Sequence, residues 1–168
     1  MRDEIEKALR LLVGLPLWSS GRAADLQWFQ FGQRRSVKGF RGDTKVVGDY
    51  ALHVQCAWHV TRNDEIIVGS RDLYYPPDET TDEPSDFDWE HSPNRRDTRI
   101  AELFNNETRK FFVRQVQVRD AGSFAVVLDE GYVLDVFPHD SLPGEHWRLF
   151  RPSTDDPHFV MTGKGLET

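Results

Sequence analysis

Residues 110–137 read KFFVRQVQVRDAGSFAVVLDEGYVLDVF, and this stretch decides the fold class. It holds three runs rich in β-branched and aromatic residues, which favour strands: Lys110–Arg119, Ser123–Leu128 and Tyr132–Phe137. The segments between them, 120–122 and 129–131, are three residues long and end in glycine. A type I turn followed by a left-handed glycine is a common three-residue hairpin connection. The stretch therefore predicts an antiparallel meander.

Further strands are expected on both sides of the meander. They are 24–32, 48–61, 65–70, 147–151 and 158–162. The clearest is 48–61, where Val54, Cys56 and Trp58 lie on one face and His53 and His59 on the other. This alternation predicts one continuous strand.

Two short helices complete the predicted elements. Residues 3–13 place apolar side chains at helical spacing, and Gly14 ends the run. Asp97 is a suitable N-cap for a second helix that ends near Asn105. The expected fold is α+β and predominantly antiparallel. A sheet of about eight strands would curl into a barrel-like or two-layer shape, with the two helices covering an edge or an open end.

Composition and charge favour one domain over 1–168. The chain has 168 residues, 12% of them aromatic, and a formal net charge of −7. An acidic balance favours solubility and disfavours a broad nucleic-acid interface. The single cysteine suits a reducing cytosol, no stretch approaches the roughly 18 apolar residues of a membrane span, and the acids near the N-terminus break the pattern of a signal peptide. We expect a cytoplasmic protein without nucleic-acid or membrane partners.

Residues 76–96 are expected to form an irregular, acidic loop, because four prolines exclude regular structure. Within it, Asp86, Phe87, Asp88 and Trp89 alternate carboxylates with large aromatics. The spacing lacks the glycine and the terminal glutamate of a calcium loop. The aromatics either pack back on the domain or anchor a protein partner.

A second candidate site is the polar face of 48–61. Asp49, His53, Gln55 and His59 share this face with Ala51 and Ala57, and they are candidates for binding a small ligand. In a continuous strand, six residues separate the two histidines by roughly 20 Å, which is too far for one zinc ion. Cys56 faces the apolar side and is expected to be a buried, inert thiol.

Three C-terminal histidines, His139, His146 and His158, lie in or near predicted loops. Loops can bring such residues together into a metal or general-base site, but no metal-ligand spacing supports one here. The five bases between Arg34 and Lys45 are expected to form a loop that faces the chain's own acids. We therefore expect neither a metal nor a cofactor.

Two stretches carry a resemblance to known proteins. They are LVGLPLWSSGRAADLQWFQFG, Leu12–Gly32, and EHWRLFRPSTDDPHFVMTGKGLE, Glu145–Glu167. Together they resemble uncharacterised bacterial families of small, single-domain α+β proteins, and some small acidic proteins of this kind are immunity proteins of polymorphic toxin systems. The resemblance implies a bacterial protein and assigns no catalytic residue.

These observations leave three functional classes open. The leading expectation is a non-catalytic protein that binds another protein, with an immunity-type role as one version. The alternative is a small-ligand-binding protein or an unrecognised hydrolase that uses the face with His53, Gln55 and His59. The third is a homo-oligomeric structural module.

Overall fold

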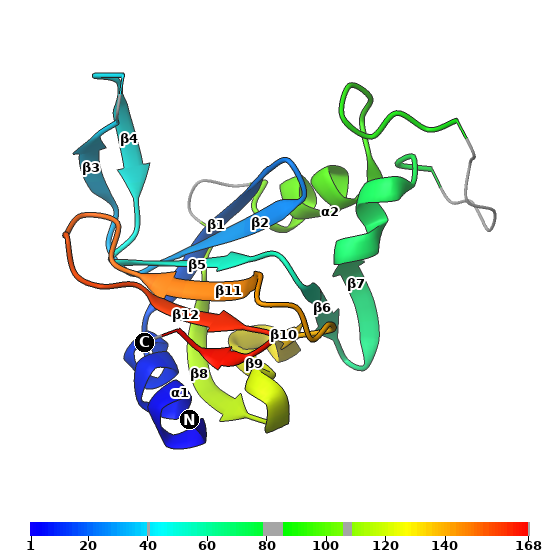
Figure 1. The fold of residues 1–168 in the computed structure, drawn as a ribbon. Coiled ribbons are helices and arrows are strands. Elements are labelled where there is room, and N and C mark those ends of the chain that lie inside the picture. Colours follow the sequence, from blue (N-terminus) through cyan, green and yellow to red (C-terminus); the bar gives the residue numbers. More distant parts are fainter. Residues whose placement is uncertain (40, 79–85, 106–108, 168) are drawn as a thin grey trace.

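The computed structural model describes residues 1–39, 41–78, 86–105 and 109–167 (Figure 1). The helices are α1 (Arg2–Leu9) and α2 (Arg95–Leu103). The strands are β1 (Pro16–Ala23), β2 (Leu26–Phe31), β3 (Arg35–Lys38), β4 (Thr44–Val47), β5 (Tyr50–Val54), β6 (Ala57–Arg62), β7 (Glu65–Gly69), β8 (Phe111–Val118), β9 (Phe124–Leu128), β10 (Tyr132–Phe137), β11 (Glu145–Phe150), β12 (Phe159–Thr162) and β13 (Gly165–Leu166). No helix among the described residues is long and apolar enough to cross a membrane.

The main sheet has eleven strands in the order β13-β12-β11-β5-β2-β1-β8-β9-β10-β6-β7, and β3 and β4 form a separate two-stranded sheet. The strand pairs are antiparallel, which confirms the predicted α+β, mainly antiparallel class. The sheet is not a closed barrel, because its end strands β13 and β7 do not pair with each other in the described chain. The curled or two-layer arrangement stays a prediction.

The predicted meander is confirmed as β8, β9 and β10, but its turns are of another type. Ala121 and Gly122 have φ of 54° and 75°, and Glu130 and Gly131 have φ of 55° and 79°. Positive φ at both central residues is the pattern of two-residue type I′ turns, whose twist matches that of the flanking strands. The Ser123 N–H donates to the Asp120 carbonyl at 3.1 Å, as such a turn requires.

The expected continuous strand over 48–61 is wrong. It breaks into β5 and β6, and the N–H groups of Gln55 and Cys56 both donate to the carbonyl of His146, at 2.8 and 3.2 Å. β5 pairs with β2 and β11 in one half of the sheet, whereas β6 pairs with β10 and β7 in the other. Val54, Cys56 and Trp58 remain buried across the break, so the alternation in the sequence does not reveal it.

The segment expected to be a basic loop also contains regular structure. Strands β3 (Arg35–Lys38) and β4 (Thr44–Val47) pair as a hairpin, which projects away from the main sheet (Figure 1). Its side chains are mostly exposed, so no apolar alternation marks these strands in the sequence.

Both halves of the sheet contribute to the core. The rings of Phe29 and Trp58 are 5.5 Å apart, and those of Phe124 and Trp147 are 5.0 Å apart, so aromatic contacts join the two halves. The helices add a second group of buried side chains: Ile5 and Leu9 from α1, Leu12 beyond it, and Ile100 and Leu103 from α2.

The start of α2 differs by three residues from the prediction. Asn94, and not Asp97, is the N-cap, and its side chain accepts a hydrogen bond from the Asp97 N–H at 2.9 Å. This earlier start places Arg96 inside the first helical turn.

Candidate functional site

The break between β5 and β6 leaves a hollow of about 280 Å³ at the surface. Its lining comes from segments far apart in the chain: Asp25, Gln55, Cys56, Ala57, Ser70, Arg71, Tyr74, Arg96 and His139. The hollow exists because β5 and β6 run in different halves of the sheet and the α2 helix packs beside the junction.

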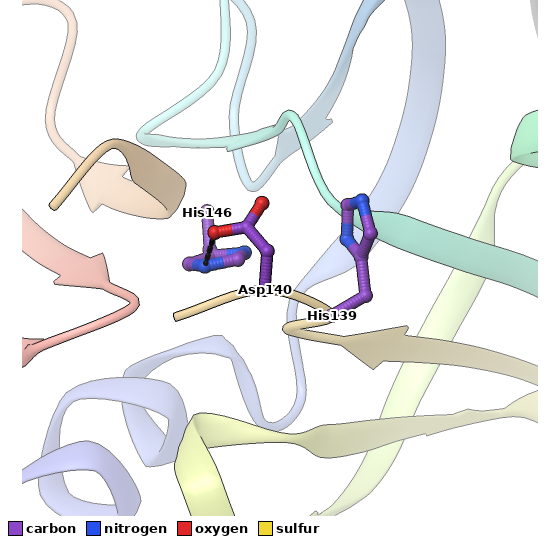
Figure 2. A group of neighbouring side chains, drawn as sticks. All are labelled: His139, Asp140 and His146. Carbon is purple, nitrogen blue, oxygen red and sulfur yellow. Dashed lines mark ion pairs between the residues drawn. The ribbon is translucent and has the colours of Figure 1, made fainter. Parts of the chain in front are cut away.

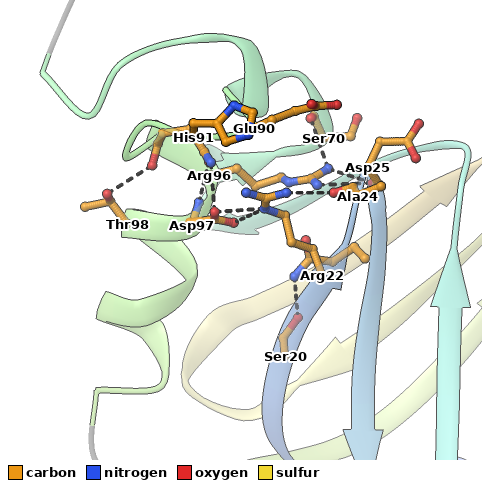
Figure 3. Close-up of polar contacts among 12 residues, drawn as sticks. Ser20, Arg22, Ala24, Asp25, Ser70, Glu90, His91, Arg96, Asp97 and Thr98 are labelled. Atoms are coloured by element: carbon orange, nitrogen blue, oxygen red, sulfur yellow. Dashed lines mark hydrogen bonds and ion pairs between the residues drawn. The ribbon is translucent and has the colours of Figure 1, made fainter. Parts of the chain in front are cut away.

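Arg96 is the most unusual residue of this lining, because its side chain is only 2% exposed. The guanidinium donates from both terminal nitrogens to the carbonyl of Asp25, at 3.1 Å each, and from Nη1 to the carbonyl of Ser70 at 3.4 Å (Figure 3). Nε has no hydrogen-bond partner in the part of the chain that the structure describes. No carboxylate of the described residues forms an ion pair with it.

Desolvation by burial lowers the pKa of Arg96 to about 10, which leaves the side chain protonated at neutral pH. No carboxylate pairs directly with this buried charge in the described chain, and the more distant charge of Asp97 offsets only part of its desolvation cost. Arg71 adds a second guanidinium to the lining. Two guanidiniums and one carboxylate, that of Asp25, therefore give the lining a net positive charge.

A network around α2 holds Arg96 in place. Nε of Arg22, on β1, donates to both carboxylate oxygens of Asp97, at 2.9 and 2.8 Å, and links the helix to the sheet (Figure 3). Asn94, which is fully buried, donates from Nδ2 to the same carboxylate at 2.8 Å. These contacts fix the first turn of the helix beside the β1–β2 connection.

Cys56 lines the same hollow but has the chemistry of a core thiol. It is 4% exposed, and burial raises its pKa to about 12. The reactive thiolate is therefore almost absent at neutral pH. The predicted burial of this cysteine is confirmed.

His139 lines the hollow and forms a cluster with Asp140 and His146, which Figure 2 shows. His139 follows β10, whose end pairs with the start of β6, while His146 is on β11, which pairs with β5. The β5–β6 junction thus brings the end of β10 and the start of β11 together. Nδ1 of His139 accepts a hydrogen bond from the Ala57 N–H at 3.2 Å.

The structure separates the residues of the predicted polar face. Gln55 lines the hollow, but His53, His59 and Asp49 do not. His53 contacts Phe150, with ring centroids 4.8 Å apart, on the part of the sheet formed by β5 and β11. Burial, with a further contribution from the charge of Arg148, lowers the pKa of His53.

His59 and Asp49 are engaged elsewhere. Nε2 of His59 lies 3.5 Å from a carboxylate oxygen of Asp135, on the neighbouring strand β10. Asp49 lies at the base of the β3–β4 hairpin, where it accepts from the Gln33 N–H at 2.7 Å and from Arg35 at 2.5 Å. Burial would raise the pKa of Asp49, but these two hydrogen bonds and the charge of Arg35 lower it below its ordinary value.

The segment of Asp86, Phe87, Asp88 and Trp89 lies beside the first turn of α2. The Asp88 carboxylate accepts from the N–H groups of Glu90 and His91, and the His91 ring lies 2.9 Å from it. The hydrogen bond with His91 lowers the pKa of Asp88. Trp89 packs edge to face on Tyr74 at 5.8 Å, under the guanidinium of Arg22 at 5.6 Å.

The partner-binding prediction therefore rests on a segment in which Trp89 packs back on the domain. Asp86 and Asp88 are exposed, and Phe87 is half-buried. Most of the acids expected to extend this patch fall in 79–85, outside the described residues.

Sequence reasoning missed Arg96, although a signal was present. Arg96, Ile100 and Leu103 follow one another at intervals of four and three residues, so they share one face of α2. A lone arginine on the apolar face of a helix is a buried charge. Because Asp97 was expected to be the N-cap, Arg96 fell outside the predicted helix, and its place on the apolar face with Ile100 and Leu103 was not recognised.

Comparison with known proteins adds no further evidence on the site. No family model, curated protein or solved structure matches the chain.

Proposed function

We propose that this chain is a binding protein and that the hollow at the β5–β6 junction takes a small, negatively charged ligand. The buried guanidinium of Arg96 carries the proposal, since no carboxylate of the described chain pairs directly with it and its Nε has no acceptor there. The charge of Asp97 acts on it only from a greater distance. A bound anion would supply a directly paired opposite charge in a site where solvent screens it weakly.

The rest of the lining suits a ligand with a carboxylate or phosphate group. Arginine binds both groups through paired donors, and Arg71 stands beside Arg96 in the lining. Gln55, Ser70 and Tyr74 add neutral polar groups that can orient the rest of the ligand. This is the small-ligand class expected from the sequence, with Gln55 as the shared residue.

Thermal unfolding with inorganic phosphate and acetate as probes tests the proposal, with sodium chloride at equal ionic strength as the reference. We expect phosphate to raise the Tm of the wild type above its value in chloride. Arg71→Gln, at an exposed position, removes one positive charge from the lining and should reduce that shift by at least half. Arg96→Lys keeps a positive charge but loses the paired N–H donors of the planar guanidinium. It should therefore also reduce the phosphate-induced shift in Tm.

Arg99→Gln is the matched control, because Arg99 lies on the same helix, pairs with Glu102 and does not line the hollow. It should leave the phosphate-induced shift unchanged. Equal responses of Arg71→Gln and Arg99→Gln would refute the assignment of the hollow.

Protein binding remains a second proposal, now favoured by the β3–β4 hairpin. This hairpin pairs with no other described strand and carries exposed Arg35, Lys38 and Lys45, together with Val46, which is 55% exposed. A projecting ribbon with basic side chains suits a partner with an acidic surface. An immunity-type role in the bacterial cytoplasm is one version of this proposal.

Affinity capture from the source organism's lysate at low and moderate salt compares the two candidate surfaces. A stoichiometric partner that is lost with Lys38→Glu/Lys45→Glu would support the hairpin. If the partner is lost with Asp86→Lys/Asp88→Lys instead, the result would support the acidic segment as the binding surface. A partner retained by both variants would exclude both surfaces.

A further inference from the structure

The group of His139, Asp140 and His146 has a geometry that the anion-binding proposal does not use. Each residue offers one ligand atom, and these atoms all lie within 4.8 Å of one another (Figure 2). Two imidazoles and a carboxylate are ligands that zinc and related divalent metals accept.

His146 supplies the independent observation that points to a bound cation. The residue is 2% exposed, and within the described part of the chain its Nε2 has no hydrogen-bond partner. The nearest carboxylate oxygen is Oδ1 of Asp140, at 3.4 Å. A buried polar atom left without a partner costs free energy, and such atoms are uncommon in native structures. A metal ion between His146 and Asp140 would remove this cost.

We propose that His139, Asp140 and His146 bind a divalent transition metal, with zinc as the reference ion. Zinc–nitrogen and zinc–oxygen bonds of about 2.0–2.2 Å bring tetrahedral ligand atoms to roughly 3.3 Å from one another. The separation of His146 and Asp140 is already close to this value. The side chain of Asp140 is 44% exposed and lies in the β10–β11 connection, so it has room to adjust. Three protein ligands leave one position for water.

His139 is expected to contribute least to the affinity. Its Nδ1 lone pair already accepts a hydrogen bond from the Ala57 N–H, and a neutral imidazole has only one such lone pair. Coordination of a metal must displace this bond. Replacement of His139 should therefore weaken metal binding less than replacement of Asp140 or His146.

The metal site and the anion site can be tested separately. His139 belongs to both, whereas Asp140 and His146 do not line the hollow and Arg71 is not part of the cluster. Asp140→Asn therefore tests the metal alone, and Arg71→Gln tests the anion alone. If one of the two proposals is refuted, the other is unaffected.

The experiment is a zinc titration of the metal-stripped full-length chain against a chromophoric chelator, followed by thermal unfolding with and without zinc. The wild type should bind one equivalent of zinc, and the bound zinc should raise its Tm. Asp140→Asn and His146→Asn should each lose at least about tenfold in affinity, and Asp140→Asn should lose the gain in Tm. Cobalt bound at the same site should show the visible absorption of a low-coordinate, nitrogen- and oxygen-ligated ion.

His91→Asn is the matched control, because His91 is an exposed histidine that also lies beside an aspartate, Asp88. It should bind zinc as the wild type does. If His146→Asn fails to fold, the exposed Asp140→Asn variant decides the question. A wild type that binds neither zinc nor cobalt, or an Asp140→Asn variant that binds zinc with unchanged affinity, would overturn the proposal.

Discussion

At the residue scale, the strongest departures from ordinary surface chemistry are two buried polar side chains, Arg96 and His146. Each residue is 2% exposed, and each keeps one nitrogen without a hydrogen-bond partner among the described residues. Desolvation makes such groups costly unless a ligand or another group satisfies them. Arg96 lines the hollow at the β5–β6 junction, and the His146 carbonyl binds the Gln55 and Cys56 N–H groups at the same junction, so both candidate sites depend on this break in the sheet.

His53 illustrates how burial at one residue links protonation to stability. Burial and the charge of Arg148 lower its pKa below 6.5, while the unfolded chain keeps the ordinary value. Between these two pKa values the unfolded state binds more protons than the folded state does. The free energy of unfolding should therefore fall as the pH decreases through about 6.5, and His53 should contribute its full stability only above that pH.

Urea unfolding at several pH values between 5 and 8 measures this contribution. His53→Gln removes the titrating group, so its free energy of unfolding should decrease less than that of the wild type as the solution is acidified. His91→Gln is a useful comparison, because the hydrogen bond with Asp88 raises the pKa of His91, the opposite shift. Parallel curves for the wild type and His53→Gln would contradict the prediction.

At the scale of elements, the first turn of α2 connects helix stability to the hollow. Asn94 accepts from the Asp97 N–H and donates to its carboxylate, and Arg96 projects from the same turn. Asn94→Ala should lower the free energy of unfolding by about 1–2 kcal/mol, because it removes a buried N-cap. It should also loosen Arg96 and weaken any binding of phosphate in the hollow.

Chemical unfolding of Asn94→Ala and Asn94→Asp checks this prediction. Aspartate keeps the side-chain oxygen that accepts from Asp97 N–H, although it adds a charge beside the Asp97 carboxylate. We therefore expect Asn94→Asp to keep the α2 amides more protected from hydrogen exchange than Asn94→Ala does. If Asn94→Ala had the same free energy of unfolding as the wild type, the N-cap would not stabilise the protein, which would contradict the prediction.

At the scale of the whole molecule, the sheet is joined at its centre by a narrow contact. The pairs Pro16–Phe112 and Leu17–Phe111 link β1 to β8, and the backbone of Val113 extends this link by hydrogen bonds to Gly14 and Leu15 at 2.8 and 3.0 Å. The aromatic contacts Phe29–Trp58 and Phe124–Trp147 add side-chain packing between the halves. We infer that packing, more than ladder hydrogen bonds, makes the two halves unfold together.

The β3–β4 hairpin should behave differently from the rest of the molecule. It has few buried side chains and no strand neighbour outside its own two strands in the described chain. Isolated two-stranded hairpins are only marginally stable in water. Hydrogen-exchange mass spectrometry should show the amides of β3 and β4 exchanging fast, and those of β5, β9 and β10 exchanging slowly. Equal protection of the hairpin and these strands would indicate an unrecognised contact that stabilises it.

Local patterns in the sequence were enough to predict the α+β class, the meander of β8, β9 and β10, and the burial of Cys56. These follow from local patterns, because the alternation of a strand and the glycines of its turns lie within a few residues of one another.

The positions of the two candidate sites, in contrast, follow from contacts between segments far apart in the chain. The break at Gln55 and Cys56 keeps the burial alternation, so no local pattern marks it, and it is held by the carbonyl of His146 from far along the chain. His139 and His146 meet because β10 pairs with β6 while β11 pairs with β5. Such pairings depend on the free energy of the whole core and not on the spacing of ligands along the chain.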